Sequence, residues 1–204
     1  MNLNTPNKLI IFRFILTLII IIILSFVPLS LTNNFSFSIG SDIYVSWLNV
    51  IALILFIIAS FTDYLDGYLA RKNNQITNFG KFFDPLADKV LINSVLVFFA
   101  AFEYIPIWIV VIFIIRDIMV DGLRMNLSTK GKVLSADKFG KLKTFFQMIG
   151  IIVLFIIHSQ PTSNYWGYNY DSYYAFSLIP ILIALYFSIY SGIKYYYNNI
   201  QELF

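Results

Sequence analysis

The chain has 204 residues, of which 59% are hydrophobic and 12% charged, and its mean hydropathy is +0.76. These values exclude an ordinary soluble domain and predict one integral membrane domain over residues 1–204. The absence of cysteine excludes disulfides and thiolate metal sites, and the small net charge of +3 gives no reason to expect a nucleic-acid partner.

Basic residues divide the chain into regions with and without positive charge. Three long stretches contain no Lys or Arg: 14–70, 90–115 and 144–193. We assign to each of them two membrane crossings, with an outer loop between them. Because Lys and Arg favour the cytoplasmic side, the pattern predicts an all-α, multi-pass membrane protein with six transmembrane helices and both termini cytoplasmic. The predicted spans are 8–29, 43–71, 80–102, 105–126, 139–159 and 174–197.

The first predicted helix has some features of a signal peptide. Lys8 and Arg13 precede an apolar run, Leu16–Leu29. No small-x-small cleavage site follows that run. This favours an uncleaved first helix, which leaves the membrane at Pro28 and leads into an outer loop near 30–42.

Uncharged runs in the third, fourth and fifth predicted helices are too short to cross a bilayer. They are Val90–Phe102, Pro106–Ile115 and Thr144–Ile157, whereas a helix needs about 20 residues to span the hydrocarbon core. These helices must therefore carry charged residues below the cytoplasmic interface. Charged groups at that depth face protein or water rather than lipid, so the sequence predicts a polar cavity open to the cytoplasmic side.

Four carboxylates occur where the second predicted helix ends and the third begins. Asp63 and Asp66 are three residues apart, and Asp84 and Asp88 are four apart, so each pair shares a helix face. Two antiparallel helices presenting these faces to each other would form a cage of oxygen donors for a hard divalent cation. A solvated helix end with ion pairs is the alternative for one pair alone. Pro85 is expected in the first turn of its helix or at a kink.

The spacing of these carboxylates resembles the motif of the CDP-alcohol phosphatidyltransferases, D-x2-D-G-x2-A-R-x8-G-x3-D-x3-D. Every fixed position is matched, by Asp63, Asp66, Gly67, Ala70, Arg71, Gly80, Asp84 and Asp88. Enzymes of this family transfer a phosphatidyl group from CDP-diacylglycerol to an alcohol and release CMP. The resemblance therefore implies a membrane enzyme of phospholipid synthesis.

The resemblance also implies a role for each motif residue. Two Mg²⁺ or Mn²⁺ ions would be bound by Asp63, Asp66, Asp84 and Asp88, and Asp88 would be the catalytic base that takes the proton of the acceptor hydroxyl. CDP would be bound by Asp63, Asp66, Gly67, Ala70, Arg71 and Gly80. As in the family, we expect a homodimer in the cell membrane, surrounded by membrane lipid, with the active site facing the cytoplasm.

Four basic residues in the second half indicate which alcohol is the acceptor. Arg116 and Arg124 lie on the fourth predicted helix, and Lys141 and Lys143 open the fifth. A dianionic phosphate needs such neutralisation, and Arg binds it bidentately. Together with Arg13 and its neighbours in the first helix, this layout resembles the family members that use glycerol 3-phosphate. We therefore predict that the four residues bind the acceptor phosphate.

Other interpretations of these residues stay open. Arg116 and Arg124 share a polar face with Asp117 and Asp121, which would also suit a structural salt-bridge network. Lys141 and Lys143 point about 200° apart on a regular helix, so only one can face the cavity; Lys141, nearer the loop, is preferred. The other would meet lipid headgroups.

Other acceptors and other functions also stay open. The family includes enzymes that use inositol phosphate, and cardiolipin synthases that use phosphatidylglycerol. A small membrane transporter is the non-enzymatic alternative. Transporters spread polar residues through the midplane and contain internal repeats, and neither is found in this sequence.

Overall fold

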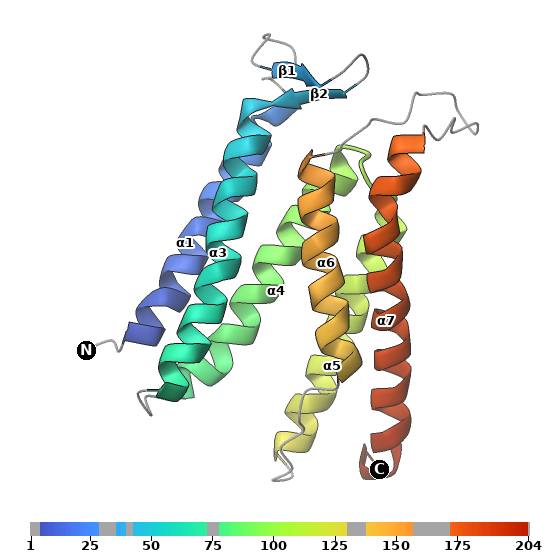
Figure 1. Cartoon of the computed structure of the whole chain (residues 1–204). Helices are drawn as coiled ribbons and strands as arrows, with labels where there is room; N and C mark the ends of the chain where they lie inside the picture. Colours follow the sequence, from blue (N-terminus) through green and yellow to red (C-terminus); the bar gives the residue numbers. More distant parts are fainter. Residues whose placement is uncertain are drawn as a thin grey trace. The chain divides into compact units, whose positions relative to one another are not determined.

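A computed structural model of the chain describes residues 5–28, 36–39, 43–72, 78–129, 138–156 and 172–203 (Figure 1). The described residues form a short β-hairpin and six long helices: α1 (Thr5–Ser25), α3 (Trp47–Lys72), α4 (Asn78–Ala101), α5 (Ile107–Thr129), α6 (Lys138–Ile156) and α7 (Ser172–Leu203). All six coincide with predicted helices, although their ends differ by a few residues. The prediction of a helical protein is therefore confirmed.

Three of the described helices are long and apolar enough to cross a membrane, by length and composition. They contain the spans Asn7–Ser25, Lys138–Ile156 and Ala175–Asn199, and a shorter apolar helix covers Trp47–Asp63. The other described helices carry charges within their apolar length, as the short uncharged runs require. These helices indicate a membrane protein, whereas six crossings and a cytoplasmic cavity stay predictions.

The chain divides into two compact units, Met1–Phe98 and Phe99–Phe204, hereafter the first and second units. The first contains α1, α3 and α4 up to Phe98. The second contains α5, α6 and α7. The prediction of one functional domain over residues 1–204 stays a prediction.

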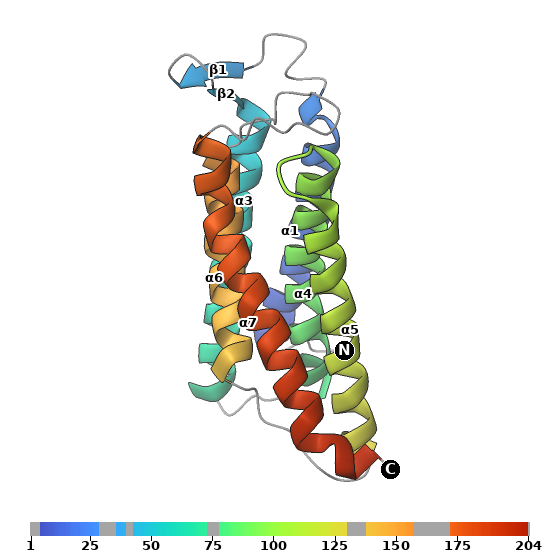
Figure 2. The same ribbon diagram turned by 90° about the vertical axis from the view of Figure 1, so that its right-hand side faces the viewer.

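In the first unit, α1 packs along α3 (Figures 1 and 2). Ile20 and Leu24 are buried on α1, and Ala52, Phe56 and Ala59 are buried on α3. The two alanines are spaced seven residues apart, so they present small side chains on one face of α3 and allow close helix packing. This contact positions the end of α3, where the first carboxylate lies.

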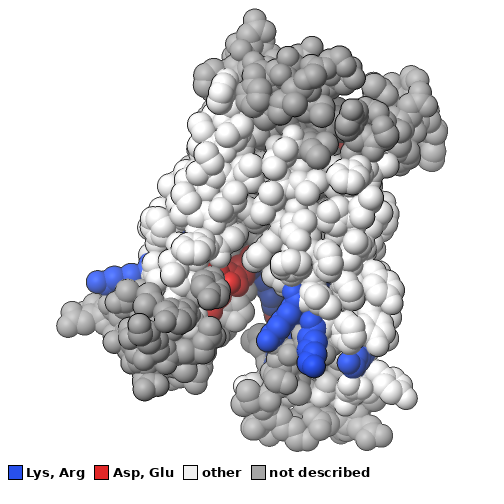
Figure 3. Space-filling view, in the orientation of Figure 1, with Lys and Arg blue, Asp and Glu red and all other residues white. Residues whose placement is uncertain are grey.

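Exposed side chains of both units are largely apolar. On α1, for example, Leu18 is 60% exposed and Ile22 is 57% exposed. In the space-filling view, uncharged side chains cover the middle of the face shown, and the Lys and Arg of the second unit gather where α6 begins (Figure 3). Helices that expose broad apolar faces suit a lipid environment.

A β-hairpin corrects the predicted start of the second helix. Strands β1 (Ser36–Ile39) and β2 (Ile43–Ser46) pair antiparallel, with Ile39 opposite Ile43. The predicted helix 43–71 therefore begins only at Trp47. Two local causes explain the shift: the segment Ile-Tyr-Val is rich in residues that favour strands, and the Ser46 hydroxyl accepts a hydrogen bond from the Leu48 N–H at 3.1 Å, as a helix N-cap does.

Pro85 lies inside α4 rather than in its first turn. The helix begins at Asn78 and continues through the proline to Ala101. The first of the two expected positions is therefore wrong. Proline has no N–H to donate to the residue four positions earlier, so the ladder of α4 lacks one hydrogen bond beside Asp84.

In the second unit, α6 and α7 approach each other closely at Gly150. A Cβ at this position would collide with Cδ1 and Cγ1 of Ile181 and would lie 3.3 Å from the Ile181 backbone nitrogen. Both residues are completely or almost completely buried, beside Leu154 and Ala184. Glycine is therefore required here because the facing helix occupies the space of a side chain.

Replacing Gly150 with Ala is expected to destabilise the protein by about 1–3 kcal/mol, because the added methyl group must push the two helices apart. The measurement is thermal unfolding in detergent, followed by intrinsic fluorescence. Gly122→Ala is the matched control, since a Cβ there meets nothing within 4 Å, and alanine is the better helix former. Equal melting temperatures for Gly150→Ala and the wild type would contradict the close approach of α6 and α7.

Candidate active site

Three carboxylates converge in the first unit. Asp63 lies in the last third of α3, and Asp84 and Asp88 lie one turn apart on α4. One oxygen of each lies within 4.8 Å of the others. Their side chains are 31%, 35% and 27% exposed, so they are partly shielded yet reachable from solvent.

The arrangement fits a divalent cation. Carboxylate oxygens are the ligands that Mg²⁺ and Mn²⁺ prefer, and like charges this close cost free energy unless a cation compensates them. These three residues could together bind such an ion. The structure thus brings together three of the four predicted metal ligands.

For the remaining motif residues, the structure describes the helix on which each lies but only some of their side chains. Gly67 lies in α3, and Gly80 lies in the first turn of α4. Asp66, Ala70 and Arg71 lie in α3, but their side chains are outside the described part of the structure. The fourth metal ligand and the CDP-binding set therefore stay predictions.

Arg13 lies in the middle of the carboxylate cluster. Its side chain is 0% exposed, and its Nη1 atom is 2.5 Å from Asp88 Oδ1 and 3.1 Å from both Asp63 Oδ1 and Asp84 Oδ1. The three ion pairs join α1 to α3 and α4. No role in the site was predicted for Arg13, although an Arg eight residues after the start of a helix rich in Ile, Leu and Phe is itself a signal, because such a charge needs a buried partner.

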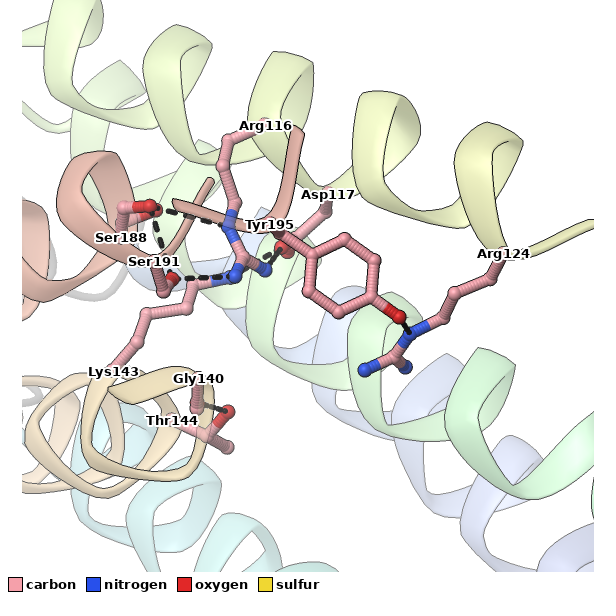
Figure 4. A network of polar contacts seen from close by, with 9 residues as sticks. All are labelled: Arg116, Asp117, Arg124, Gly140, Lys143, Thr144, Ser188, Ser191 and Tyr195. Carbon is pink, nitrogen blue, oxygen red and sulfur yellow. Dashed lines mark hydrogen bonds and ion pairs between the residues drawn. The ribbon is translucent and has the colours of Figure 1, made fainter. Parts of the chain in front are cut away.

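A second polar cluster occupies the second unit (Figure 4). Asp117 Oδ1 accepts hydrogen bonds from Lys143 Nζ at 2.5 Å and from Arg116 Nη1 at 3.1 Å. Asp117 and Lys143 are buried, with side chains 7% and 5% exposed. One carboxylate thus pairs with two cations, and the three groups together keep a net positive charge.

Arg116 and Arg124 lie on α5, and both form hydrogen bonds to residues of α7. Arg116 donates from Nη2 to Ser191 Oγ at 2.6 Å and from Nε to the Ser188 carbonyl at 3.3 Å. Arg124 donates from Nε to the Tyr195 hydroxyl at 3.2 Å, and its guanidinium lies 5.5 Å from the centre of the Tyr195 ring. Ser188, Ser191 and Tyr195 are three and four residues apart, so they form one stripe along α7.

Gly192 explains why Arg116 can cross α7 at this level. A Cβ on Gly192 would lie 3.2 Å from Arg116 Cγ and 3.7 Å from Arg116 Nε. The bare backbone therefore leaves room for the arginine stem. The spacing of Ser188, Ser191, Gly192 and Tyr195 was the available sequence signal for this stripe, and sequence reasoning missed it.

The structure also separates the two lysines of α6. Lys143 is buried and paired with Asp117, and its ammonium lies 5.6 Å from the centre of the Phe113 ring. Lys141 is exposed. Burial is therefore the reverse of the expected preference for Lys141, because Asp117 on α5 meets the face of α6 that carries Lys143. Of the alternative salt-bridge network on the fourth predicted helix, the described residues show the Arg116–Asp117 pair.

Two buried polar atoms beside this cluster have no hydrogen-bond partner. They are Gln147 Nε2, one turn beyond Lys143 on the same face of α6, and Ser188 Oγ on α7. Gln147 is 1% exposed and Ser188 is 0% exposed. A buried donor without a partner costs about 1–3 kcal/mol, and a bound polar ligand would remove that cost.

The chain belongs to the CDP-alcohol phosphatidyltransferase family: the family model matches residues 3–190. This confirms the resemblance inferred from the carboxylate motif. Among curated relatives, a CDP-diacylglycerol–glycerol-3-phosphate 3-phosphatidyltransferase of Bacillus subtilis (strain 168) is 37% identical over 200 residues, covering 98% of this chain and 97% of that protein.

Two further relatives carry the same name. The Mycoplasma genitalium protein is 38% identical over 170 residues, which cover 82% of this chain and 72% of that protein. The Wigglesworthia glossinidia brevipalpis protein is 33% identical over 209 residues, which cover 100% of this chain and 99% of that protein. The similarity thus extends over both units.

Proposed function

We propose that this chain transfers the phosphatidyl group of CDP-diacylglycerol to sn-glycerol 3-phosphate, giving phosphatidylglycerophosphate and CMP. The observation that carries the choice of acceptor is the pair of cations, buried Lys143 and partly buried Arg116, that Asp117 holds together in the second unit. An acceptor that carries a phosphate dianion needs cations fixed in this way. The names of the similar proteins support the same acceptor.

For the donor, we propose that Asp63, Asp66, Asp84 and Asp88 bind two Mg²⁺ or Mn²⁺ ions. Bound ions of this kind neutralise the negative charge of a pyrophosphate and of the leaving CMP. The three described carboxylates offer oxygens within 4.8 Å of one another, which supports this part of the proposal. Gly67, Ala70, Arg71 and Gly80 complete the proposed CDP site, with Arg71 as a phosphate contact.

Asp88 is the proposed base. Its carboxylate takes the proton from the acceptor hydroxyl, whose oxygen forms a bond to the phosphorus of the phosphatidyl group. The bond from that phosphorus to the bridging oxygen of the pyrophosphate breaks, and CMP leaves with the bond electrons. A carboxylate near cations is a weak base, but the loose transition state of phosphoryl transfer demands little from it.

For the acceptor, we propose that its phosphate binds to Arg116, Arg124 and Lys143. The structure gives less support to Lys141, which is exposed. Gln147 Nε2 and Ser188 Oγ are buried without partners beside these cations, and we propose that they contact the same ligand. Tyr195 and Ser191 fix the arginines in place.

The remaining features of the proposal concern location. We propose a single catalytic domain over residues 1–204 that crosses the cell membrane six times and has both termini in the cytoplasm. Its polar cavity opens to the cytoplasmic side, where nucleotide and glycerol phosphate are soluble, and the acyl chains of the donor stay in the bilayer. A homodimer is expected from the family.

CMP release with a panel of acceptors tests the function. The purified full-length chain receives Mg²⁺ and CDP-diacylglycerol together with sn-glycerol 3-phosphate, inositol phosphate, serine or phosphatidylglycerol. We expect CMP with glycerol 3-phosphate only, because only a phosphate-bearing acceptor of that size satisfies the basic cluster.

Each other outcome rejects a defined part of the proposal. CMP with phosphatidylglycerol or serine would retain the carboxylate site and overturn the role of the basic cluster. CMP with inositol phosphate alone would retain a phosphate-binding cluster and change the alcohol. No CMP with any acceptor, from protein that melts cooperatively, would contradict the enzymatic activity itself.

A further inference from the structure

Arg13 is the residue whose environment the proposed reaction leaves unexplained. A fully buried guanidinium in an apolar helix is costly unless ion pairs compensate for its loss of hydration. Here the compensation comes from three carboxylates at once, and all three are metal-ligand candidates. The same oxygens therefore serve two cations, the arginine and the divalent ion.

The three described ion pairs of Arg13 meet at one of its atoms. Nη1 contacts Oδ1 of Asp63, of Asp84 and of Asp88. Because this nitrogen contacts one oxygen of each carboxylate, it occupies the position in which a cation bound by all three carboxylates would lie. The three carboxylates carry three negative charges when ionised, and Arg13 reduces that total to two.

We propose that Arg13 is the resident counter-ion of the carboxylate cluster. In the metal-free protein its guanidinium holds Asp63, Asp84 and Asp88 together and stabilises the packing of α1 with α3 and α4. A divalent ion competes with it for the same oxygens, so Arg13 withdraws from them when metal binds. This inference rests on the metal-binding part of the proposed function and does not depend on the acceptor.

Competition has two consequences of opposite sign. Without Arg13, the metal-free cluster is a set of like charges with no cation, so the metal-free protein becomes less stable. Metal binding no longer has to displace the guanidinium, so the affinity for a divalent ion rises. An ion that binds only the folded state therefore raises the melting temperature of a variant without Arg13 more than it raises that of the wild type.

The test measures Mn²⁺ binding and thermal unfolding of full-length protein that has been stripped with EDTA. Free Mn²⁺ is followed by electron paramagnetic resonance during a titration without lipid substrate. For Arg13→Gln we expect a lower melting temperature without metal and a Kd for Mn²⁺ about tenfold lower than that of the wild type. Tenfold corresponds to the loss of about one charged hydrogen bond from the competing cation.

Two variants complete the design. Lys8→Gln removes an exposed positive charge from the same helix and should leave the Kd within about twofold, since exposed charges are screened. Arg13→Lys retains the charge on a shorter side chain without a planar fork, so its Kd should fall between those of Arg13→Gln and the wild type. If Arg13→Gln does not fold, Arg13→Lys tests the proposal in its place.

The outcomes separate the inference from the proposed function. Mn²⁺ that fails to bind the wild type would reject both the metal site and the counter-ion. Binding to the wild type with an unchanged or higher Kd in both Arg13 variants would overturn the counter-ion alone, because Arg13 would then organise the ligands without competing for them.

Discussion

Replacing Asp63 or Asp84 with Asn is expected to reduce CMP release at least about a hundredfold, because each substitution removes a charged oxygen ligand from the proposed divalent ion, which would neutralise the leaving group. Both variants should remain folded. Each loses one ion pair with Arg13, at 3.1 Å in both cases, but the repulsion within the cluster falls at the same time. The measurement is turnover over a range of Mg²⁺ concentrations, with the melting temperature recorded in EDTA.

Glu103→Gln is the matched control for these variants. Glu103 is an exposed acidic residue just beyond the far end of α4, so its neutralisation changes the net charge by the same amount without touching the cluster. Its turnover should stay within about twofold of the wild type, as for other exposed charges. Wild-type turnover in Asp63→Asn or Asp84→Asn would reject the metal cage.

Features that arise from local spacing were predictable from the sequence. The placement of Lys and Arg gave the six helices, since charge is confined to short regions between apolar runs. The interval between Asp84 and Asp88 placed both on one face of α4, because helical periodicity fixes which residues share a face, and Asp63 lies on the preceding helix, α3. In both cases the physical cause lies within one or two consecutive elements.

Features that depend on contacts between distant elements were not predictable. Arg13 is separated from Asp88 by most of the first unit, and no periodicity connects them. Lys143 became the buried lysine because Asp117 on α5 packs against that face of α6, whereas Lys141 lies nearer the start of the helix and is exposed. The hairpin before α3 was missed because residues 43–45 favour a strand, and the helix starts only after Ser46, whose hydroxyl caps it.

The two lysines of α6 give the sharpest test of the acceptor site. Lys143→Gln is expected to raise the KM for glycerol 3-phosphate by about tenfold to a hundredfold, the range for a lost hydrogen bond to a charged group. The KM for CDP-diacylglycerol should not change. Lys141→Gln removes the same charge from an exposed position two residues away, so its KM values should stay within about twofold of the wild type.

A purely structural role for Lys143 predicts a different result, and Asp117 allows the two roles to be separated. If Lys143 only neutralises Asp117, then Lys143→Gln lowers the melting temperature because the buried carboxylate loses one of its two cation partners and keeps only Arg116, and adding Asp117→Asn restores both stability and KM. If Lys143 binds the acceptor phosphate, the double variant regains stability while its KM for glycerol 3-phosphate stays high. We expect the second result, because the ammonium of Lys143 and the guanidinium of Arg116 together exceed the single charge of Asp117, and two cations fixed side by side attract a phosphate. A KM that recovers fully in the double variant would assign Lys143 to the scaffold and leave Arg116 and Arg124 as the acceptor ligands.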